Sequence, residues 1–215
     1  MTASNTIYID IDDVLCETAR AFMVVLEREF GKHVAYEDLT TFDLGKACGI
    51  TKDEVDRLFE LAHAEEVILG LTAKIGGKDM LRQWADRGYV LAIVTGRPPS
   101  LYDVSHEWLA RHQIPYDDFI IVDKFGRFRA DDPIAISKDA LAALDFCLAI
   151  EDSLEMATYV ADRMATPVAL MDCPWNREDN LHPRITRIAG GKIWKEFYSR
   201  SSFCQARCLI CSGKP

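Results

Sequence analysis

The sequence predicts an α/β fold: a doubly wound, Rossmann-like parallel sheet with a small helical cap inserted after its first strand. Short apolar runs alternate with helical patterns along the chain. Most of these runs are continuously apolar, which is typical of parallel strands covered on both faces. Residues 17–75, between the first two runs, are too numerous for a simple crossover and carry helical patterns of their own. These three observations together define the class.

The predicted core consists of five strands and the helices between them. We expect the strands at residues 6–11, 89–95, 119–123, 146–151 and 167–171. Apolar residues spaced three and four positions apart predict helices at residues 77–87, 101–112, 137–144 and 153–164. Ser153 is placed to cap the last of these helices, because its hydroxyl can accept an N–H of the first turn.

The inserted segment is expected to contain two helices. The first begins near Thr18, which can cap it, and ends at Gly31, while the second spans residues 51–64. We therefore divide the chain into a core (residues 1–16 and 76–200), a cap (17–75) and a cysteine-containing tail (201–215).

Composition limits the classes of partner. The chain has 215 residues, 49% hydrophobic content and a formal net charge of −9, which indicates a globular protein with an ample core. It has no dense run of Lys and Arg, so a nucleic-acid polymer is not expected as a partner. The sequence shows no leader pattern and no apolar stretch of about 18 residues. We therefore expect a cytoplasmic protein without membrane contact, and the sequence leaves its oligomeric state open.

The three cysteines of the tail have the spacing of a known metal-binding motif. Cys204, Cys208 and Cys211 match the pattern that binds an iron–sulfur cluster in radical-SAM enzymes, but no barrel pattern accompanies them. An oxidisable tail or a weak zinc site is the favoured interpretation.

Acidic residues end the first predicted strand. Asp10, Asp12 and Asp13 follow the apolar run 7–9. Clustered carboxylates repel one another and resist desolvation, unless a cation or a reaction uses them. Alternation along an extended chain would place Asp10 and Asp12 on the same side, about 7 Å apart. This arrangement suits a nucleophile, a proton shuttle and a divalent metal.

Other polar groups follow the later strands or open a helix beside them. Ligands of open α/β sheets bind outside the carboxyl ends of the strands, so these groups are candidates for the same site. They are Thr95, Gly96 and Arg97 after the second strand, Lys138 at the start of a helix, and Glu151 and Asp152 after the fourth strand.

These motifs resemble those of haloacid-dehalogenase-superfamily phosphohydrolases. The matching segments are 10–15 (DIDDVL), 93–97 (IVTGR), 137–138 (SK) and 150–152 (IED), in the order of that family. A narrower resemblance, to the 5′(3′)-deoxyribonucleotidase branch, is carried by residues 95–98 (TGRP), 108–109 (WL), 114–117 (IPYD) and 171–177 (MDCPWNR).

The resemblance implies a Mg²⁺-dependent phosphomonoesterase that acts on a small phosphorylated substrate, expected to be a nucleotide. Asp10 would attack phosphorus and form an aspartyl-phosphate, and Asp12 would be the acid–base. Mg²⁺ would be bound by Asp10, by the backbone carbonyl of Asp12 and by Asp152.

Three further residues would contact the substrate according to the same resemblance, and Arg97 is a fourth candidate from its position. Thr95 and the N–H of Gly96 would hold phosphoryl oxygens. Lys138 would neutralise charge on Asp10 and on the phosphoryl group, so that Thr95 and Lys138 count among the catalytic residues. Arg97 would either grip the substrate phosphate or pair with an acid, and the sequence does not separate these alternatives.

Several positions have more than one interpretation. Lys124 is a second candidate lysine but fits the motif order less well than Lys138. Asp13 stands where the family usually has glycine, and we expect it to turn outward to solvent rather than face the metal. Glu151 is expected to support the site rather than bind the metal. The remaining candidates are expected in the core rather than around a nucleobase: Phe42, Trp175 and Asn176.

Two alternative functions remain open at this level. The first is a phosphatase for another small phosphate ester, such as a sugar phosphate, because the cap decides the substrate. The second is a non-catalytic protein that binds a phosphate ligand on the same scaffold.

Overall fold

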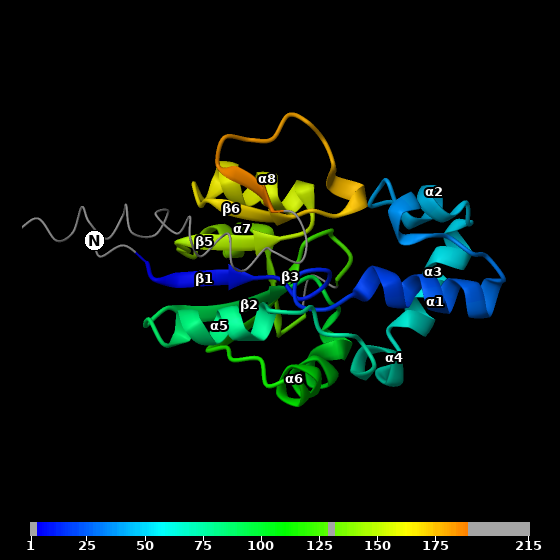
Figure 1. Ribbon diagram of the computed structural model, residues 1–215, viewed down its shortest axis with the longest axis horizontal. Coiled ribbons are helices and arrows are strands. Elements are labelled where there is room, and N and C mark those ends of the chain that lie inside the picture. The colour runs from blue at the N-terminus through cyan, green and yellow to red at the C-terminus, as the bar shows by residue number, and fades with distance from the viewer. Residues whose placement is uncertain (1–3, 129–131, 189–215) are drawn as a thin grey trace, which may run out of the picture.

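A seven-stranded parallel sheet forms the centre of the computed structural model, which describes residues 4–128 and 132–188 (Figure 1). The strand order is β4-β3-β2-β1-β5-β6-β7. The bounds are β1 Thr6–Ile9, β2 Val90–Thr95, β3 Asp118–Asp123, β4 Ala135–Ser137, β5 Leu148–Glu151, β6 Val168–Met171 and β7 Ile185–Ile188. The predicted α/β class and the five predicted strands are confirmed, whereas the two short edge strands, β4 and β7, were not predicted.

Two pairs of helices cover the two faces of the sheet (Figure 1). Helices α5 (Gly77–Ala85) and α6 (Tyr102–Arg111) pack on one face, and α7 (Lys138–Ala142) and α8 (Leu154–Arg163) pack on the other. Ser153 caps α8 as predicted, because its hydroxyl accepts the N–H of Met156 at 3.3 Å. These layers leave the carboxyl ends of the strands free to carry a site.

Successive residues of β1 point to opposite faces of the sheet. Ile7 and Ile9 belong to the hydrophobic cluster under α5 and α6, whereas Tyr8 belongs to the cluster under α7 and α8. Alternation with a period of two therefore places Tyr8 on the same face as Asp10, just beyond the strand. At the end of β3, Val122 and Lys124 are likewise two residues apart, so they point to the same face of the sheet.

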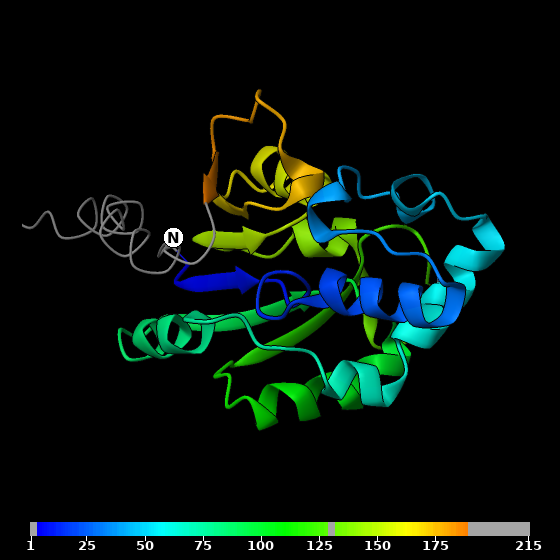
Figure 2. The same cartoon turned by 45° about the vertical axis from the view of Figure 1, so that its right-hand side comes forward.

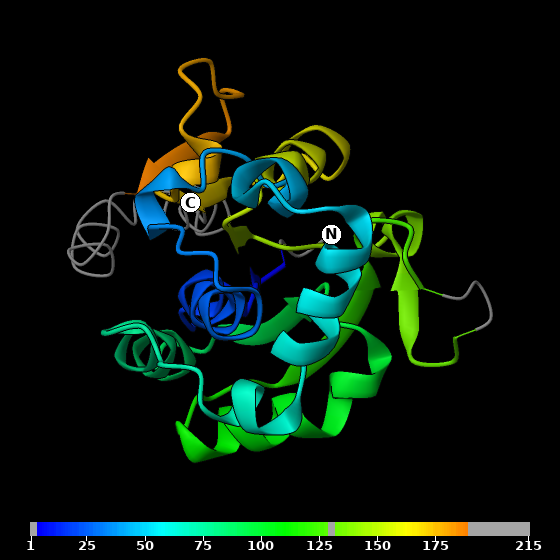
Figure 3. The same cartoon turned by 90° about the vertical axis from the view of Figure 1, so that its right-hand side faces the viewer.

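The inserted segment stands over the carboxyl ends of the strands (Figures 2 and 3). It contains four α-helices rather than the two predicted: α1 Thr18–Phe30, α2 Leu44–Cys48, α3 Lys52–Ala62 and α4 Glu65–Leu69. Phe22, Leu26 and Leu58 are among the buried residues of its separate hydrophobic cluster. We propose that the cap and the core meet at the predicted boundaries, after residues 16 and 75.

The first helix of the cap is capped differently from the prediction. Thr18 is the first helical residue of α1, and Glu17 before it makes no side-chain cap. Instead, the Asp13 carboxylate accepts the N–H of Ala19 at 2.9 Å. An acidic residue of the core therefore forms the N-terminal cap of α1. Gly31 ends α1 in the left-handed conformation, as predicted.

Two predictions concern parts of the chain that are only partly described. The tail, with Cys204, Cys208 and Cys211, lies outside the described residues, as do residues 189–200 at the end of the predicted core. Within residues 4–128 and 132–188, every helix is too short or too polar to cross a membrane.

Candidate active site

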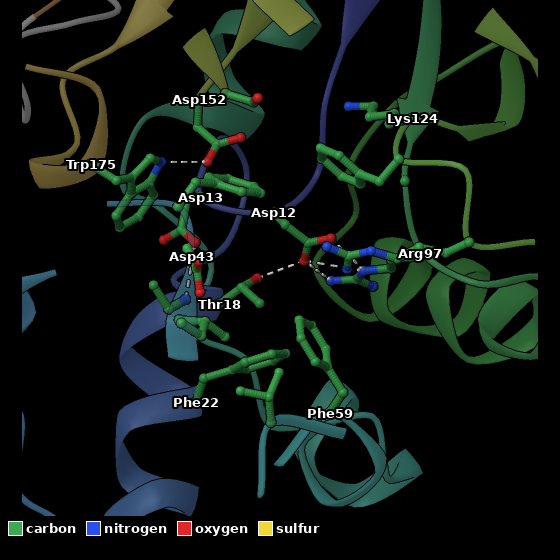
Figure 4. Close-up of a pocket in the computed structure, with 18 of the residues that line it drawn as sticks. Asp12, Asp13, Thr18, Phe22, Asp43, Phe59, Arg97, Lys124, Asp152 and Trp175 are labelled. Atoms are coloured by element: carbon green, nitrogen blue, oxygen red, sulfur yellow. Dashed lines mark hydrogen bonds and ion pairs between the residues drawn. The ribbon is translucent and has the colours of Figure 1, made fainter. Parts of the chain in front are cut away.

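A cavity of about 790 Å³ lies between the carboxyl ends of the strands and the cap (Figure 4). Its acidic residues, Arg97 and Lys124 come mainly from the core, whereas the cap adds apolar side chains such as Phe22 and Phe59 and polar ones such as Asp43. The predicted site residues that line it are Asp10, Asp12, Gly96, Arg97 and Asp152; Asp13, Lys124 and Glu151 line it as well. The structure therefore brings most, but not all, of the predicted site residues together.

Asp10 is buried beside an ammonium group. The Lys124 Nζ atom lies 3.0 Å from Asp10 Oδ1 and 2.5 Å from Glu151 Oε1, and the lysine side chain is only 3% exposed. Burial alone would lower the pKa of Lys124, but Asp10 and Glu151 raise it well above its ordinary value. Lys124 is therefore a charged partner of Asp10 inside the site.

Lys138, the predicted catalytic lysine, is not among the residues that line this cavity. Its ammonium lies 3.5 Å from Glu155 and 5.5 Å from the centre of the Tyr159 ring, and its side chain is 34% exposed. The prediction placed this lysine wrongly because the unpredicted strand β4 puts it at the edge of the sheet. Lys124 directly follows β3, which lies one strand closer to β1.

Gly96 explains how Lys124 reaches across the end of β2. A Cβ atom at Gly96 would lie 3.1 Å from Lys124 Cδ and 3.4 Å from Lys124 Cγ. A side chain at this position would therefore press on the lysine stem, which crosses β2 to reach Asp10. Glycine is therefore favoured at position 96 for a steric reason, in addition to the predicted contact of its N–H with a phosphoryl group.

Three carboxylates form a cluster suited to a cation. One ligand atom from each of Asp10, Glu151 and Asp152 lies within 4.8 Å of the others, and all three residues are buried. Burial and the neighbouring carboxylates raise the pKa of Asp10 to about 8, despite the opposing effect of Lys124. Burial, Glu151 and Asp10 likewise raise the pKa of Asp152 well above its ordinary value.

The donor set of this cluster fits a hard divalent ion, because Mg²⁺ prefers carboxylate and carbonyl oxygens. One lysine cannot neutralise three buried carboxylates, so a divalent cation would relieve the desolvation that raises these pKa values. Trp175 orients Asp152 by donating its Nε1–H to Oδ2 at 3.1 Å (Figure 4).

Asp12 is held by a clamp that joins the core to the cap (Figure 4). The Arg97 guanidinium donates to both carboxylate oxygens, with Nη2 at 2.7 Å from Oδ1 and Nε at 3.0 Å from Oδ2. The hydroxyl of Thr18, at the start of α1, donates to Oδ1 at 2.6 Å. Burial acts to raise the pKa of Asp12, but Arg97 and Thr18 lower it below its ordinary value. The structure therefore shows Arg97 paired with an acid.

Asp13 faces the cavity instead of solvent, so the expected outward orientation is wrong. It is 6% exposed, it has a φ of 52°, and its carbonyl accepts a hydrogen bond from the Lys74 ammonium. Burial raises the pKa of Asp13 to about 7, although Lys74 and the Ala19 N–H lower it. Its inward orientation is explained by the hydrogen bond that its carboxylate accepts from the N-terminus of α1.

Thr95 is fully buried at the end of β2, and it does not line the cavity. Its hydroxyl accepts the N–H of Arg97 at 3.1 Å, which is the capping type of role that a threonine often has. Its predicted contact with a phosphoryl oxygen remains a proposal.

Aromatic side chains line the cavity both beside the carboxylates and on the cap. The Phe42 ring lies 5.5 Å from that of Phe125 and 6.5 Å from that of Trp175, and Phe22 lies 5.6 Å from Phe59. These five rings all line the cavity. Phe42 is 47% exposed, so the expectation that it lies in the core is wrong. Trp175 lines the cavity and also packs against buried core residues.

Asn176, the third residue of that group, is fully buried. Its amide donates to the backbone carbonyls of Asp152 and Met171, so it braces the loops behind the acidic cluster.

Sequence reasoning underestimated Lys124 and missed Thr18 as a partner of Asp12. The sequence did indicate Lys124, because it directly follows the carboxyl end of an apolar strand. No pattern in the sequence indicated that Thr18 contacts Asp12, because its position before a helical pattern predicts only a helix cap.

Comparisons with known proteins agree with this geometry. Residues 4–158 match the family model described as "5' nucleotidase, deoxy (Pyrimidine), cytosolic type C protein". "Putative nucleotidase BH1399" of Halalkalibacterium halodurans is 28% identical over 199 residues, with 91% of this chain and 95% of the relative covered. "Putative nucleotidase YqfW" of Bacillus subtilis is 28% identical over 173 residues, which cover 79% of this chain and 81% of the relative.

Solved structures share the fold. A predicted phosphatase from Clostridium acetobutylicum has a TM-score of 0.62 at 14% identity, with 92% of this chain and 99% of that chain covered. A HAD-family hydrolase from Deinococcus radiodurans, solved with bound phosphate and sodium, has a TM-score of 0.56 at 13% identity, with coverages of 94% and 96%. Because the family model matches residues 4–158, which is most of this chain, the chain belongs to the cytosolic type C family of 5′ nucleotidases (deoxy, pyrimidine).

Proposed function

We propose that this chain is a Mg²⁺-dependent nucleotidase that hydrolyses nucleoside or deoxynucleoside monophosphates through an aspartyl-phosphate on Asp10. Its family makes it a phosphomonoester hydrolase. The proposal adds the metal, the class of substrate and the roles of the residues. A cytoplasmic location is proposed from its similarity to cytosolic nucleotidases.

One observation carries the proposal: a buried carboxylate, an ammonium and two further carboxylates meet in a cavity that aromatic side chains also line. The charged groups suit a phosphoryl group. The aromatic side chains, among them Phe42, Phe125 and Trp175, suit a flat ring attached to it, because stacked or edge-on ring contacts are favourable. A sugar phosphate would leave these aromatic side chains without a matching partner, so a nucleotide is favoured.

The metal would be held by carboxylate oxygens of Asp10 and Asp152 and by the Asp12 carbonyl. When bound, it supplies positive charge that lets the anionic nucleophile and the anionic substrate approach each other. Glu151 is a poorer ligand than the other two acids, because both of its oxygens already accept hydrogen bonds from protein groups.

The residues of the chain would divide the remaining chemistry. Asp10 attacks phosphorus, and Lys124 neutralises charge on both Asp10 and the phosphoryl oxygens, taking the role predicted for Lys138. Asp12 would give a proton to the leaving alcohol and then accept one from the water that hydrolyses the aspartyl-phosphate. Because Arg97 lowers the pKa of Asp12 in the structure, this role requires the Arg97 pair to loosen when the substrate binds. The Gly96 N–H and the Thr95 hydroxyl would orient phosphoryl oxygens.

A phosphate-release screen over nucleoside monophosphates and sugar phosphates, with Mg²⁺ or with EDTA, tests the proposal. We expect release from nucleotides that needs the metal and is lost in Asp10→Asn. Asp86→Asn is the matched control, because Asp86 is exposed and does not line the cavity.

Three outcomes would contradict the proposal in different ways. Turnover of sugar phosphates alone would reject the nucleotide. Retained turnover in Asp10→Asn would reject the nucleophile. The absence of turnover at every metal concentration would reject catalysis and favour a protein that only binds its ligand.

A further inference from the structure

Tyr8 is a buried tyrosine that contributes to the site from behind. Its side chain is 0% exposed, and its ring packs edge-on against Phe146 with the ring centres 5.6 Å apart. Its hydroxyl donates to Glu151 Oε1 at 2.5 Å. Phenylalanine would fill the same apolar space, so packing alone does not explain the hydroxyl.

Glu151 is held by four donors. Its Oε2 atom accepts the N–H groups of Asp152 at 3.1 Å and Ser153 at 3.2 Å. Its Oε1 atom is shared by the Tyr8 hydroxyl and the Lys124 ammonium, each at 2.5 Å. The carboxylate is 0% exposed, so its charge is screened by these groups and by little water.

Lys124 is divided between two carboxylates that compete for it. Its Nζ atom is 2.5 Å from Glu151 Oε1 but 3.0 Å from Asp10 Oδ1, so Glu151 is the closer partner. A second donor on Oε1 spreads the negative charge of Glu151 over two hydrogen bonds. If the Tyr8 hydroxyl were removed, Lys124 would be the only described donor on this oxygen and would be drawn away from Asp10.

We propose that Tyr8 is a positioning residue: its hydroxyl fixes Glu151 and so keeps the Lys124 ammonium shared with Asp10 and available to a phosphoryl group. This inference rests on the proposed function, in which Asp10 is the nucleophile. Tyr8 itself does not line the cavity, so it acts through Glu151 and Lys124.

Tyr8→Phe isolates the hydroxyl. The Lys124 ammonium lies 5.5 Å from the centre of the Tyr8 ring, and phenylalanine keeps this contact and the packing on Phe146. Glu151 keeps three donors, so we expect the variant to fold. Tyr116→Phe is the matched control, because it removes a tyrosine hydroxyl bonded to His106 Nδ1 at 2.6 Å, away from the cavity.

The test is steady-state kinetics at saturating Mg²⁺ on the best substrate of the phosphate-release screen. We expect kcat to fall about tenfold or more in Tyr8→Phe, as for the loss of a hydrogen bond to a charged group, while KM changes less than about threefold. In Tyr116→Phe both constants should stay within about twofold. Circular dichroism and thermal unfolding verify that each variant is folded.

A double-mutant cycle with Glu151→Gln separates positioning from packing. Glutamine removes the charge that competes for Lys124, so adding Tyr8→Phe to Glu151→Gln should lower kcat by less than about twofold. A packing role would give the same loss in both backgrounds.

The outcomes distinguish this inference from the function on which it rests. If the wild-type protein releases no phosphate, the proposed function fails before any variant is compared. If the wild type is active and Tyr8→Phe keeps kcat within about twofold, or if the cycle is additive, only the positioning role is overturned.

Discussion

Replacing Lys124 by methionine should abolish most of the activity, whereas the same change at Lys138 should not. Lys124 lies 3.0 Å from Asp10 and is 3% exposed. Two unit charges at this distance attract by about 5.5 kcal/mol at an effective dielectric constant of about 20. Part of this attraction offsets desolvation, and removing one partner of a buried pair typically costs about 3–5 kcal/mol.

If about 3 kcal/mol of this is lost from the transition state, kcat should fall more than about 100-fold in Lys124→Met. Lys138 and Glu155 are 34% and 67% exposed, and such surface pairs contribute about 0–1 kcal/mol. Lys138→Met is therefore the matched control, with kcat within about twofold of the wild type.

The assay is Mg²⁺-dependent phosphate release, with circular dichroism to verify folding. Lys124→Arg, which keeps the charge, supplies a second variant if the methionine variant does not fold, and should retain more activity than Lys124→Gln. Normal turnover in Lys124→Met together with its loss in Lys138→Met would refute the reasoning and restore Lys138 as the catalytic lysine.

Three further predictions concern the residues around this pair. Gly96→Ala should lower kcat with little loss of fold, because the added Cβ would lie 3.1 Å from Lys124 Cδ; kinetics and thermal unfolding check this, and unchanged kcat would contradict it. The pKa of Asp10 is about 8 in the folded protein and 3.8 ordinarily. At pH values between these two, the folded protein therefore keeps Asp10 protonated, whereas the unfolded chain has lost that proton. In EDTA, the wild type should therefore lose stability relative to Asp10→Asn as pH rises toward 8, by at most about 1.4 kcal/mol per pH unit. If thermal stability changed with pH equally in both proteins, this prediction would be wrong. Asp13→Ala should be about 1–2 kcal/mol less stable than Asp13→Asn in urea unfolding, because asparagine keeps an acceptor for Ala19 and tolerates a positive φ; equal stabilities would exclude the capping role.

Local periodicity predicted the main elements of the core. Continuous apolar runs predicted five of the seven strands, and the spacing of apolar residues predicted α5, α6 and α8 to within a few residues. Ser153 and Gly31 acted as predicted, because caps depend on backbone groups only a few residues away. The short strands β4 and β7 and the short cap helices α2 and α4 were missed, because three to five residues give too little of a pattern.

The order of motifs predicted Asp10, Asp12 and Asp152 at one end of the sheet, and the structure places all three around one cavity. Motif order was misleading for the lysine. The position of Lys124 depends on the order of strands, on the room left by Gly96 and on a side chain long enough to cross β2. None of these is a property of adjacent residues.

By itself, therefore, the sequence determined the α/β class, the acidic end of the first strand and the resemblance that names the chemistry. Only the tertiary structure decided which distant side chains meet: Lys124 rather than Lys138 beside Asp10, Arg97 and Thr18 on Asp12, and the Tyr8 hydroxyl on Glu151. The physical reason is that hydrogen-bonded periodicity acts over a few residues, whereas charges buried in a low dielectric must find partners wherever the packed chain brings them.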